Sequence, residues 1–203
     1  MVLGLTGGVG SGKSTVADFL KNEFGAALIL SDNVAKDMMK KGNESYEVVV
    51  EHFSKDILDE EGNIDNNKLS KIVFCDENEL NWLNNATHPI VIRRIKDIID
   101  EYIKEDRKLI VLESALLAKS GCDDICDHIW YVCTDDDERI IRLGNDRGYS
   151  KDKSKSIFNN QDSNEYYSDT SDEIIYNNAG LIELKEKVRD SIMRLNEKYN
   201  IGL

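Results

Sequence analysis

The segment from Gly7 to Ser14 reads Gly-Gly-Val-Gly-Ser-Gly-Lys-Ser and fits the pattern G-x-x-x-x-G-K-[ST] from end to end. The apolar run 2–6 before it predicts a short buried strand, and apolar residues at spacings of three and four over 13–24 predict a helix after it. A strand, a glycine loop and a helix in this order aim backbone N–H groups at polyphosphate. The segment therefore predicts a nucleoside triphosphate site rather than an ordinary glycine-rich turn.

The residue types of this loop suit contact with phosphate. Glycines allow backbone angles closed to other residues and carry no side chain that would keep phosphates away. Lys13 offers an ammonium group to the β- and γ-phosphates, and the Ser14 hydroxyl is a suitable ligand for Mg²⁺. The predicted nucleotide-binding residues of the segment are Gly8, Gly10, Ser11, Gly12, Lys13, Ser14 and Thr15.

Length and composition favour one soluble α/β domain. A chain of 203 residues is too short for two full domains and a linker. No apolar run reaches membrane-spanning length and no secretory signal pattern opens the chain, so we expect a cytoplasmic protein. The formal charge of −13 opposes a nucleic-acid partner, because such binding depends on Lys and Arg neutralising phosphates. A nucleotide needs only a local group of cations.

The four cysteines form no Cys-x-x-Cys pair. Cys122 and Cys126 lie four residues apart and close to His128, which raises the alternative of a metal site. Zinc sites usually have a different spacing and a second ligand pair, so we interpret the cysteines as reduced structural thiols.

Four further apolar runs predict strands, at 26–30, 108–113, 128–133 and 173–176. Most are nearly continuous rather than alternating, as in parallel strands that helices cover on both faces. Helices are predicted at 13–24, 32–41, 45–53, 65–85, 88–105, 136–146, 150–161 and 181–198. The pattern indicates an α/β fold with helices on both sides of a parallel sheet.

The strands are unevenly spaced, which suggests inserts within a single domain, 1–203. The stretch 31–107 has helical patterns and is longer than one crossover needs, so we interpret it as a helical substrate-binding region. The polar stretch 144–171 has no apolar run able to anchor a core, and we interpret it as a mobile lid. The predicted nucleotide-binding core comprises 1–30, 108–143 and 172–203.

Two broad classes of protein use such a loop: switches or motors that hydrolyse the triphosphate, and kinases that pass its γ-phosphoryl group to an acceptor. A guanine-specific switch is expected to carry Asn-Lys-x-Asp after its fourth strand, where this chain has Val132-Cys133-Thr134-Asp135. The length of the chain, the helical insert and the short lid favour a small-molecule kinase.

Five segments, in order along the chain, resemble landmarks of the dephospho-CoA kinase family. Leu5–Thr15 is similar to its opening motif, Ser31–Lys36 to the segment after its second strand, and His88–Arg93 to its His-Pro helix start. The stretch 116–121 resembles the motif after its third strand, and Asn178–Gly180 resembles its late Asn-Ser-Gly turn. Apart from the glycine loop no single motif is specific, and the shared order carries the resemblance.

The resemblance implies a three-layer α/β/α P-loop kinase fold with a five-stranded parallel sheet, a helical CoA region and a short lid. It implies transfer of the ATP γ-phosphoryl group to the ribose 3′-hydroxyl of dephospho-CoA, with Mg²⁺, giving CoA and ADP. The partner would be this small molecule, with no nucleic acid or membrane, and the protein a monomer or small homo-oligomer. A nucleoside, nucleotide or other small-metabolite kinase is the main alternative, and a regulatory ATPase or switch is the third.

Three segments supply candidates for acceptor binding. Asp32 is the predicted acceptor of the hydroxyl proton, and the alternative is that Asp32 and Ser31 only cap the next helix. Glu113 ends the third strand, where it would orient substrate or hold Mg²⁺ through water, or instead pair with a cation. The resemblance implies a substrate contact for His88 at a helix start, against a locally hydrogen-bonded residue. Arg93 either meets anionic substrate groups or lies on a solvated surface.

Lid cations are expected at Arg139, Arg142 and Arg147. A guanidinium group brought to the β- and γ-phosphates would stabilise the charge of the transferring group, and we predict this role for Arg142 and Arg147. Arg139 and Arg142 lie three residues apart on one helix face and alternatively pair with the acidic run 135–138. Asn178 is predicted to contact the adenine ring of ATP.

The chain departs from the family pattern mainly on the substrate side. Leu30 replaces the first acid of Asp-Ala-Asp, and Glu113, Ala115 and Lys119 differ from Asp-x-Pro-Leu-Leu-Phe-Glu. Arg147 follows Asp146, in the inverse of the family's Arg-Asp order. These departures leave the ATP-binding residues unchanged and are the reason for keeping a different acceptor as an alternative.

Overall fold

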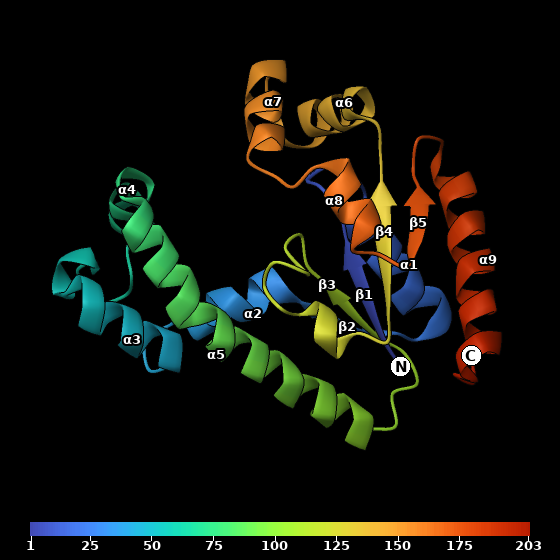
Figure 1. Cartoon of the computed structure of the whole chain (residues 1–203), viewed down its shortest axis with the longest axis horizontal. Helices are drawn as coiled ribbons and strands as arrows, with labels where there is room; N and C mark the ends of the chain where they lie inside the picture. The colour runs from blue at the N-terminus through green and yellow to red at the C-terminus, as the bar shows by residue number, and fades with distance from the viewer. The chain divides into compact units, whose positions relative to one another are not determined.

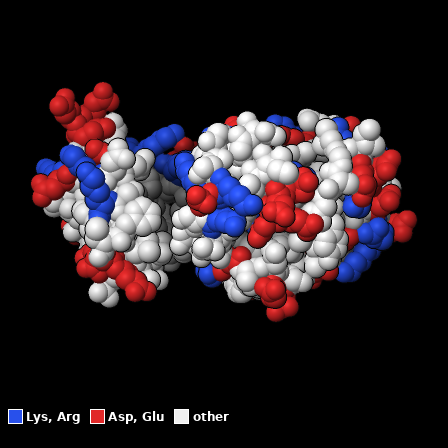
Figure 2. Space-filling model, turned by 90° about the horizontal axis from the view of Figure 1, so that it is seen from above, with Lys and Arg blue, Asp and Glu red and all other residues white.

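The computed structural model describes all 203 residues and divides into two compact units. The first comprises Met1–Ile29 and Ile99–Leu203, and the second comprises Leu30–Ile98. No helix in either unit has the length and apolar character needed to cross a membrane. On the face drawn in Figure 2, basic side chains form small groups interspersed with acidic ones.

A five-stranded parallel sheet forms the centre of the first unit (Figure 1). Its strands are β1 (Val2–Thr6), β2 (Ala27–Leu30), β3 (Ile110–Glu113), β4 (His128–Cys133) and β5 (Glu173–Tyr176), in the order β2-β3-β1-β4-β5. In β1, Leu3 pairs with Val111 of β3 on one side and with His128 of β4 on the other. The five predicted strands are confirmed, and their carboxyl ends meet at one edge, where ligands of such sheets bind.

Two helices bury apolar stripes against this sheet, α1 (Lys13–Phe24) and α9 (Leu181–Tyr199), and they lie side by side (Figure 1). The buried residues of the two stripes are Val16, Ala17, Phe19, Leu20, Leu184, Val188, Ile192 and Leu195. They join Leu3, Leu5, Val111 and Trp130 of the strands in one core. The nearly continuous apolar strands of the sequence are therefore the centre of this core.

Three helices follow β4: α6 (Asp136–Arg147), α7 (Lys151–Asn159) and α8 (Asn164–Asp169). In Figure 1, α6 and α7 lie beyond the carboxyl end of β4. The segment is tied to the core although it has no apolar run. Tyr167 is buried, its ring stacks on Tyr131 with centroids 5.2 Å apart, and its hydroxyl donates to the Ala115 carbonyl.

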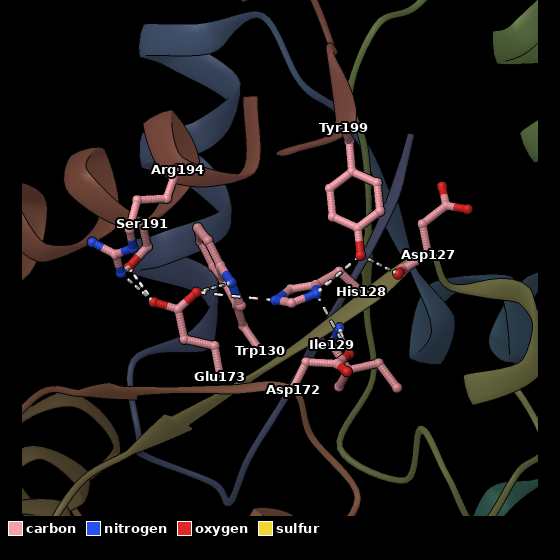
Figure 3. Close-up of polar contacts among 9 residues, drawn as sticks. All are labelled: Asp127, His128, Ile129, Trp130, Asp172, Glu173, Ser191, Arg194 and Tyr199. Atoms are coloured by element: carbon pink, nitrogen blue, oxygen red, sulfur yellow. Dashed lines mark hydrogen bonds and ion pairs between the residues drawn. The ribbon is translucent and has the colours of Figure 1, made fainter. Parts of the chain in front are cut away.

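A polar cluster joins α9 to β4 and β5 (Figure 3). The carboxylate of Glu173 accepts hydrogen bonds from Trp130 Nε1 at 3.1 Å, Ser191 Oγ at 2.6 Å and Arg194 Nη2 at 2.6 Å. Glu173 opens β5 and Trp130 lies within β4. The C-terminal helix is thus held to the sheet by polar contacts as well as by its apolar stripe.

The second unit is helical, as the sequence predicted for this stretch. It contains α2 (Ser31–Met38), α3 (Glu44–Phe53), the 3₁₀ turn η1 (Lys55–Ile57), α4 (Asn66–Cys75) and most of α5 (Glu77–Lys104). The first unit has a second 3₁₀ turn, η2 (Asp123–Ile125). The core of the helical unit is small and consists of Val49, Ile57, Leu69 and Val73 with partly buried neighbours.

The predicted helices 65–85 and 88–105 were wrong in their boundaries. The first helix ends at Cys75, because Asp76 has an extended backbone and its carboxylate accepts a hydrogen bond from the Asn78 N–H at 2.9 Å. This contact begins a new helix at Glu77. That helix, α5, then runs without a break to Lys104.

Proline does not interrupt α5. Pro89 lies inside the helix, where a proline removes one backbone hydrogen bond and its ring crowds the preceding turn. Packing on either side offsets this cost, since Leu83 contacts the core of the helical unit and Ile90 is buried. The expectation that a helix starts at His88 is therefore wrong.

Candidate active site

The phosphate loop, Gly7–Gly12, turns between β1 and α1. Gly10 and Gly12 have φ values of 77° and 95°, in the left-handed region that favours glycine. The Ser11 N–H donates to the Gly8 carbonyl at 3.2 Å and closes the turn. Because α1 begins at Lys13 without a side-chain cap, the N–H groups of its first turn lack helical acceptors and suit an anion.

Lys13 lies against this loop. Its ammonium group donates to the Gly7 carbonyl at 2.7 Å and to the Gly8 carbonyl at 3.0 Å. Ser11 is buried and its hydroxyl has no hydrogen-bond partner, whereas Thr15 is exposed on the first turn of α1. The structure therefore brings the predicted loop residues together and leaves the Ser11 side chain pointing into the protein.

Ser14 and Glu113 bring two oxygen donors together at the carboxyl edge of the sheet. Ser14 Oγ donates to Glu113 Oε1 at 3.3 Å, and Glu113 is the last residue of β3. Such hard oxygens suit Mg²⁺, which usually takes only one or two protein ligands and completes its shell with water and phosphate. The chain has no cluster of three or more acidic, His or Cys residues arranged to hold a metal ion.

The underside of the loop is supported by two buried residues that sequence analysis missed. Thr134 Oγ1 donates to the Ser11 carbonyl at 2.9 Å, and Asn177 Nδ2 donates to the same carbonyl at 2.8 Å. Both follow directly after strands, β4 and β5, at the carboxyl edge. Polar residues just beyond apolar strands are the signal that would have indicated them.

Arg142 reaches the loop from α6. Its Nη2 donates to the Asn177 carbonyl at 2.8 Å. A Cβ atom added to Gly12 would lie 3.8 Å from Arg142 Nη1, so the guanidinium group is close to the start of α1. Asn178, the predicted adenine contact, is exposed, and its Oδ1 accepts from the Asp135 N–H at 2.9 Å. That bond joins the loops that follow β4 and β5.

The other two arginines of α6 differ in exposure. Arg139 is buried, and its Nη1 pairs with Asp136 Oδ1 at 2.8 Å, so for this residue the alternative of pairing with the acidic run is the observed one. Its Nε donates to the Val9 carbonyl at 2.9 Å. Arg147, in the last turn of α6, is exposed.

Three further candidates lie in the helical unit. Asp32 is the exposed second residue of α2, and this helix begins without a side-chain cap, so the capping alternative for Asp32 is wrong. His88 lies in the middle of α5, where burial lowers the pKa of its imidazole. Arg93 forms an exposed ion pair with Glu44, which raises the pKa of the guanidinium group.

All four cysteines are free. Cys126 Sγ donates to the Cys122 carbonyl at 3.3 Å, and burial raises the pKa of the Cys126 thiol to about 12. A thiol with so high a pKa stays protonated at neutral pH, which agrees with a structural role for Cys126.

Solved structures resemble the whole chain. The crystal structure of TT1252 from Thermus thermophilus matches with a TM-score of 0.81 and 25% identity, covering 96% of each chain. A dephospho-CoA kinase from Campylobacter jejuni gives 0.72 and 23% identity, covering 98% of each. A shikimate kinase from Acinetobacter baumannii gives 0.54 at 13% identity, covering 97% of this chain and 93% of its own, and supports the fold alone. The fold is therefore that of P-loop kinases.

Two bacterial dephospho-CoA kinases are similar in sequence over nearly the whole chain. A dephospho-CoA kinase from Carboxydothermus hydrogenoformans is 36% identical over 98% of this chain and 94% of its own length. One from Fusobacterium nucleatum is 37% identical over 93% of this chain and 95% of its own. The family model for dephospho-CoA kinases matches residues 1–183. With the phosphate loop, the parallel sheet and these matches together, the chain belongs to the dephospho-CoA kinase family.

Proposed function

We propose that this chain transfers the γ-phosphoryl group of ATP to the ribose 3′-hydroxyl of dephospho-CoA, giving CoA and ADP. The observation that carries the proposal is the phosphate loop between β1 and α1, in a chain that belongs to the dephospho-CoA kinase family. Such a transfer requires from a protein alignment of two substrates, neutralisation of charge and an acceptor for one proton.

The triphosphate lies in the phosphate loop, where first-turn N–H groups of α1 meet its oxygens. Lys13 exchanges the Gly7 and Gly8 carbonyls, its present partners, for β- and γ-phosphate oxygens. Arg142 adds positive charge from α6, and its position near Gly12 supports this role. Arg147, exposed in the last turn of α6, is the second guanidinium group in this role, from the lid segment 144–171. Asn178 borders the adenine ring.

Mg²⁺ fits beside Ser14 and Glu113. Their oxygens, 3.3 Å apart, are donors of the kind that this ion prefers. When bound, Mg²⁺ neutralises negative charge on the β- and γ-phosphates. The protein's own part is to hold the two oxygens at the end of the loop and to keep the triphosphate aligned.

The acceptor side rests on residues of the segment 31–107. Asp32 accepts the proton of the ribose 3′-hydroxyl as the oxygen attacks, a role supported by its place at the start of α2 and by the absence of a capping contact. His88 and Arg93 contact the anionic and base portions of dephospho-CoA. Arg93 then gives up its exposed pairing with Glu44 in favour of a substrate phosphate.

The partner is a small molecule and the protein acts in the cytoplasm as a monomer or small homo-oligomer. The formal charge of −13, and the scattered basic side chains of Figure 2, support a small ligand over a nucleic-acid polyanion. The nucleotide-binding core comprises 1–30, 108–143 and 172–203.

The test is turnover of ATP with a panel of acceptors. Dephospho-CoA is expected to support steady turnover, whereas nucleosides and nucleotides are expected not to. If only a nucleoside is phosphorylated efficiently, the chain is a small-metabolite kinase instead. The departures from the family pattern at Leu30, Ala115 and Lys119 are the reason for testing this alternative. Hydrolysis without any acceptor, unaffected by Asp32→Asn, would favour a regulatory ATPase.

A further inference from the structure

Gln161, in the connection between α7 and α8, holds the tip of the phosphate loop. Gln161 Oε1 accepts two hydrogen bonds, from the Val9 N–H at 3.1 Å and from Arg139 Nη2 at 2.7 Å. Arg139 Nε in turn donates to the carbonyl of the same Val9 at 2.9 Å. Val9, Arg139 and Gln161 therefore form a closed ring of hydrogen bonds around one residue of the loop.

Arg139 uses all three of its nitrogens in hydrogen bonds within the protein. Its third nitrogen, Nη1, pairs with Asp136 at 2.8 Å, and its guanidinium group lies 3.7 Å from the centre of the Phe158 ring. The loop is shaped to admit it, because a Cβ atom on Gly8 would lie only 2.4 Å from Arg139 Nη2. Each nitrogen of the buried guanidinium group donates to a protein acceptor, so Arg139 orients Gln161 and the loop.

Asp162, which follows Gln161 in the sequence, has a contact of its own to another part of the protein. Asp162 forms an ion pair with Lys119, which lies in the connection after β3, and this pairing raises the pKa of Lys119. The Asp162 side chain is only 7% exposed, and the Lys119 ammonium also lies 5.7 Å from the centre of the Tyr166 ring. The positive charge at Lys119, a departure from the family pattern, thus has its own partner in this chain.

We propose that Gln161 is a positioning residue for ATP, and that the Lys119–Asp162 ion pair is its anchor. Gln161 and Asp162 connect α7 to α8, so the two contacts fasten this connection to the loop on one side and to the segment after β3 on the other. The carboxamide fixes the Val9 peptide, and with it the curvature of the loop whose neighbouring N–H groups meet phosphate. This inference rests on the proposed binding of ATP in the loop and adds a residue to it.

A preorganised loop binds ATP without first being ordered. Loss of the hydrogen-bond ring should therefore weaken nucleotide binding more than it lowers the stability of the folded protein. Gln161→Met keeps the length of the side chain but removes the acceptor. The dissociation constant of Mg-ATP, measured by calorimetry without acceptor, is expected to rise on the order of tenfold, as for loss of a hydrogen bond to a charged group. The KM for dephospho-CoA should stay at the wild-type value.

Asn160→Leu is the matched control. Asn160 is the neighbouring amide residue, and its Nδ2 contacts only the Ser156 carbonyl within α7, at 2.9 Å. This variant should bind ATP as the wild type does. The anchor is tested by Lys119→Gln, which should weaken ATP binding in the same direction but less, and by Lys119→Arg, which keeps the charge and should restore wild-type affinity.

An affinity of Gln161→Met for ATP equal to that of the wild type would overturn the proposal, whatever its melting temperature. A rise confined to the KM for dephospho-CoA would also overturn it, by assigning Gln161 to the acceptor. The binding measurement needs no acceptor, so it stands even if the wild type fails to phosphorylate dephospho-CoA. That failure would contradict the proposed function instead.

Discussion

Ser14 Oγ donates to Glu113 Oε1 over 3.3 Å, although 99 positions of sequence separate the two residues. The parallel pairing of β1 with β3, which sets Leu5 opposite Glu113, brings the carboxylate to the end of the phosphate loop. A loop hydroxyl and a strand-end carboxylate therefore meet where Mg²⁺ would accompany the triphosphate.

This relationship predicts the metal dependence of Ser14 variants. Ser14→Ala removes one oxygen of the pair, so the Mg²⁺ concentration for half-maximal activity should rise several-fold, measured in a titration at saturating ATP. Ser14→Thr keeps the hydroxyl and serves as the conservative control, which should retain the wild-type requirement. Equal Mg²⁺ requirements in all three proteins would remove Ser14 from the metal site.

Asp32→Asn tests the proposed proton acceptor. General base catalysis contributes about 10²- to 10⁴-fold, so kcat should fall within that range while the KM for ATP stays nearly unchanged. Because Asp32 makes no capping contact, the melting temperature should also stay unchanged. Asp37→Asn, in the same helix and paired on the surface with Lys40 at 2.5 Å, is the control and should retain activity. A wild-type kcat in Asp32→Asn would exclude the role.

Arg142→Met tests the cation on α6. Removing charge that stabilises the transferring phosphoryl group should lower kcat on the order of 10²-fold, with a smaller effect on ADP binding. The control is Arg189→Met, which removes an exposed arginine of α9 that lies 3.6 Å from Glu23 of α1. If both variants lose the same fraction of activity, Arg142 does not act by supplying positive charge near the loop.

The polar cluster of Figure 3 predicts a pH dependence of stability. His128 is buried between Tyr199 and the carboxylates of Asp172 and Glu173, with Nδ1 3.7 Å from Asp172 and Nε2 4.0 Å from Glu173. Burial lowers its pKa, outweighing the attraction of the two carboxylates, and Lys198 lowers it further.

The sign follows from proton linkage. The unfolded chain binds this proton at about pH 6.5, and the folded protein binds it only at lower pH, so the unfolded state gains the proton first. The contribution of His128 to stability is complete above about pH 6.5 and declines as the pH falls toward the folded pKa. Melting temperatures between pH 7.5 and 5 should therefore fall more steeply in the wild type than in His128→Gln.

Tyr199→Phe keeps the histidine and loses only the hydroxyl that lies 3.5 Å from Nδ1. It should retain the steeper pH dependence of the wild type, even if its melting temperature is lower throughout. Parallel pH profiles for the wild type and His128→Gln would mean that burial does not lower the pKa of this histidine.

Much of the fold could be predicted because its three inner strands, β1, β3 and β4, are almost wholly buried. The runs at β1, β4 and β5 coincide with the observed strands, and β1 and β4 are buried along nearly their whole length in the inner part of the sheet. The start of α5 was missed, although Asp76 followed by Glu79 has the spacing of a helix-capping pair. Its continuation through Pro89 depends on packing that sequence does not display.

The candidate site was predictable only where its residues are neighbours in sequence. Gly12, Lys13 and Ser14 form one motif, and local geometry decides their placement. Arg139 and Gln161 reach Val9 from 130 and 152 positions away, so their role appears only once the strand order brings these segments together.

The most direct measurement is the identity of the product when purified protein, ATP, Mg²⁺ and dephospho-CoA are combined. Mass spectrometry should find dephospho-CoA heavier by one phosphoryl group, phosphorus NMR should place that group on the ribose 3′-oxygen, and Lys13→Ala should form little of it. Release of free phosphate with dephospho-CoA unchanged, or a phosphoryl group at another position, would contradict the account.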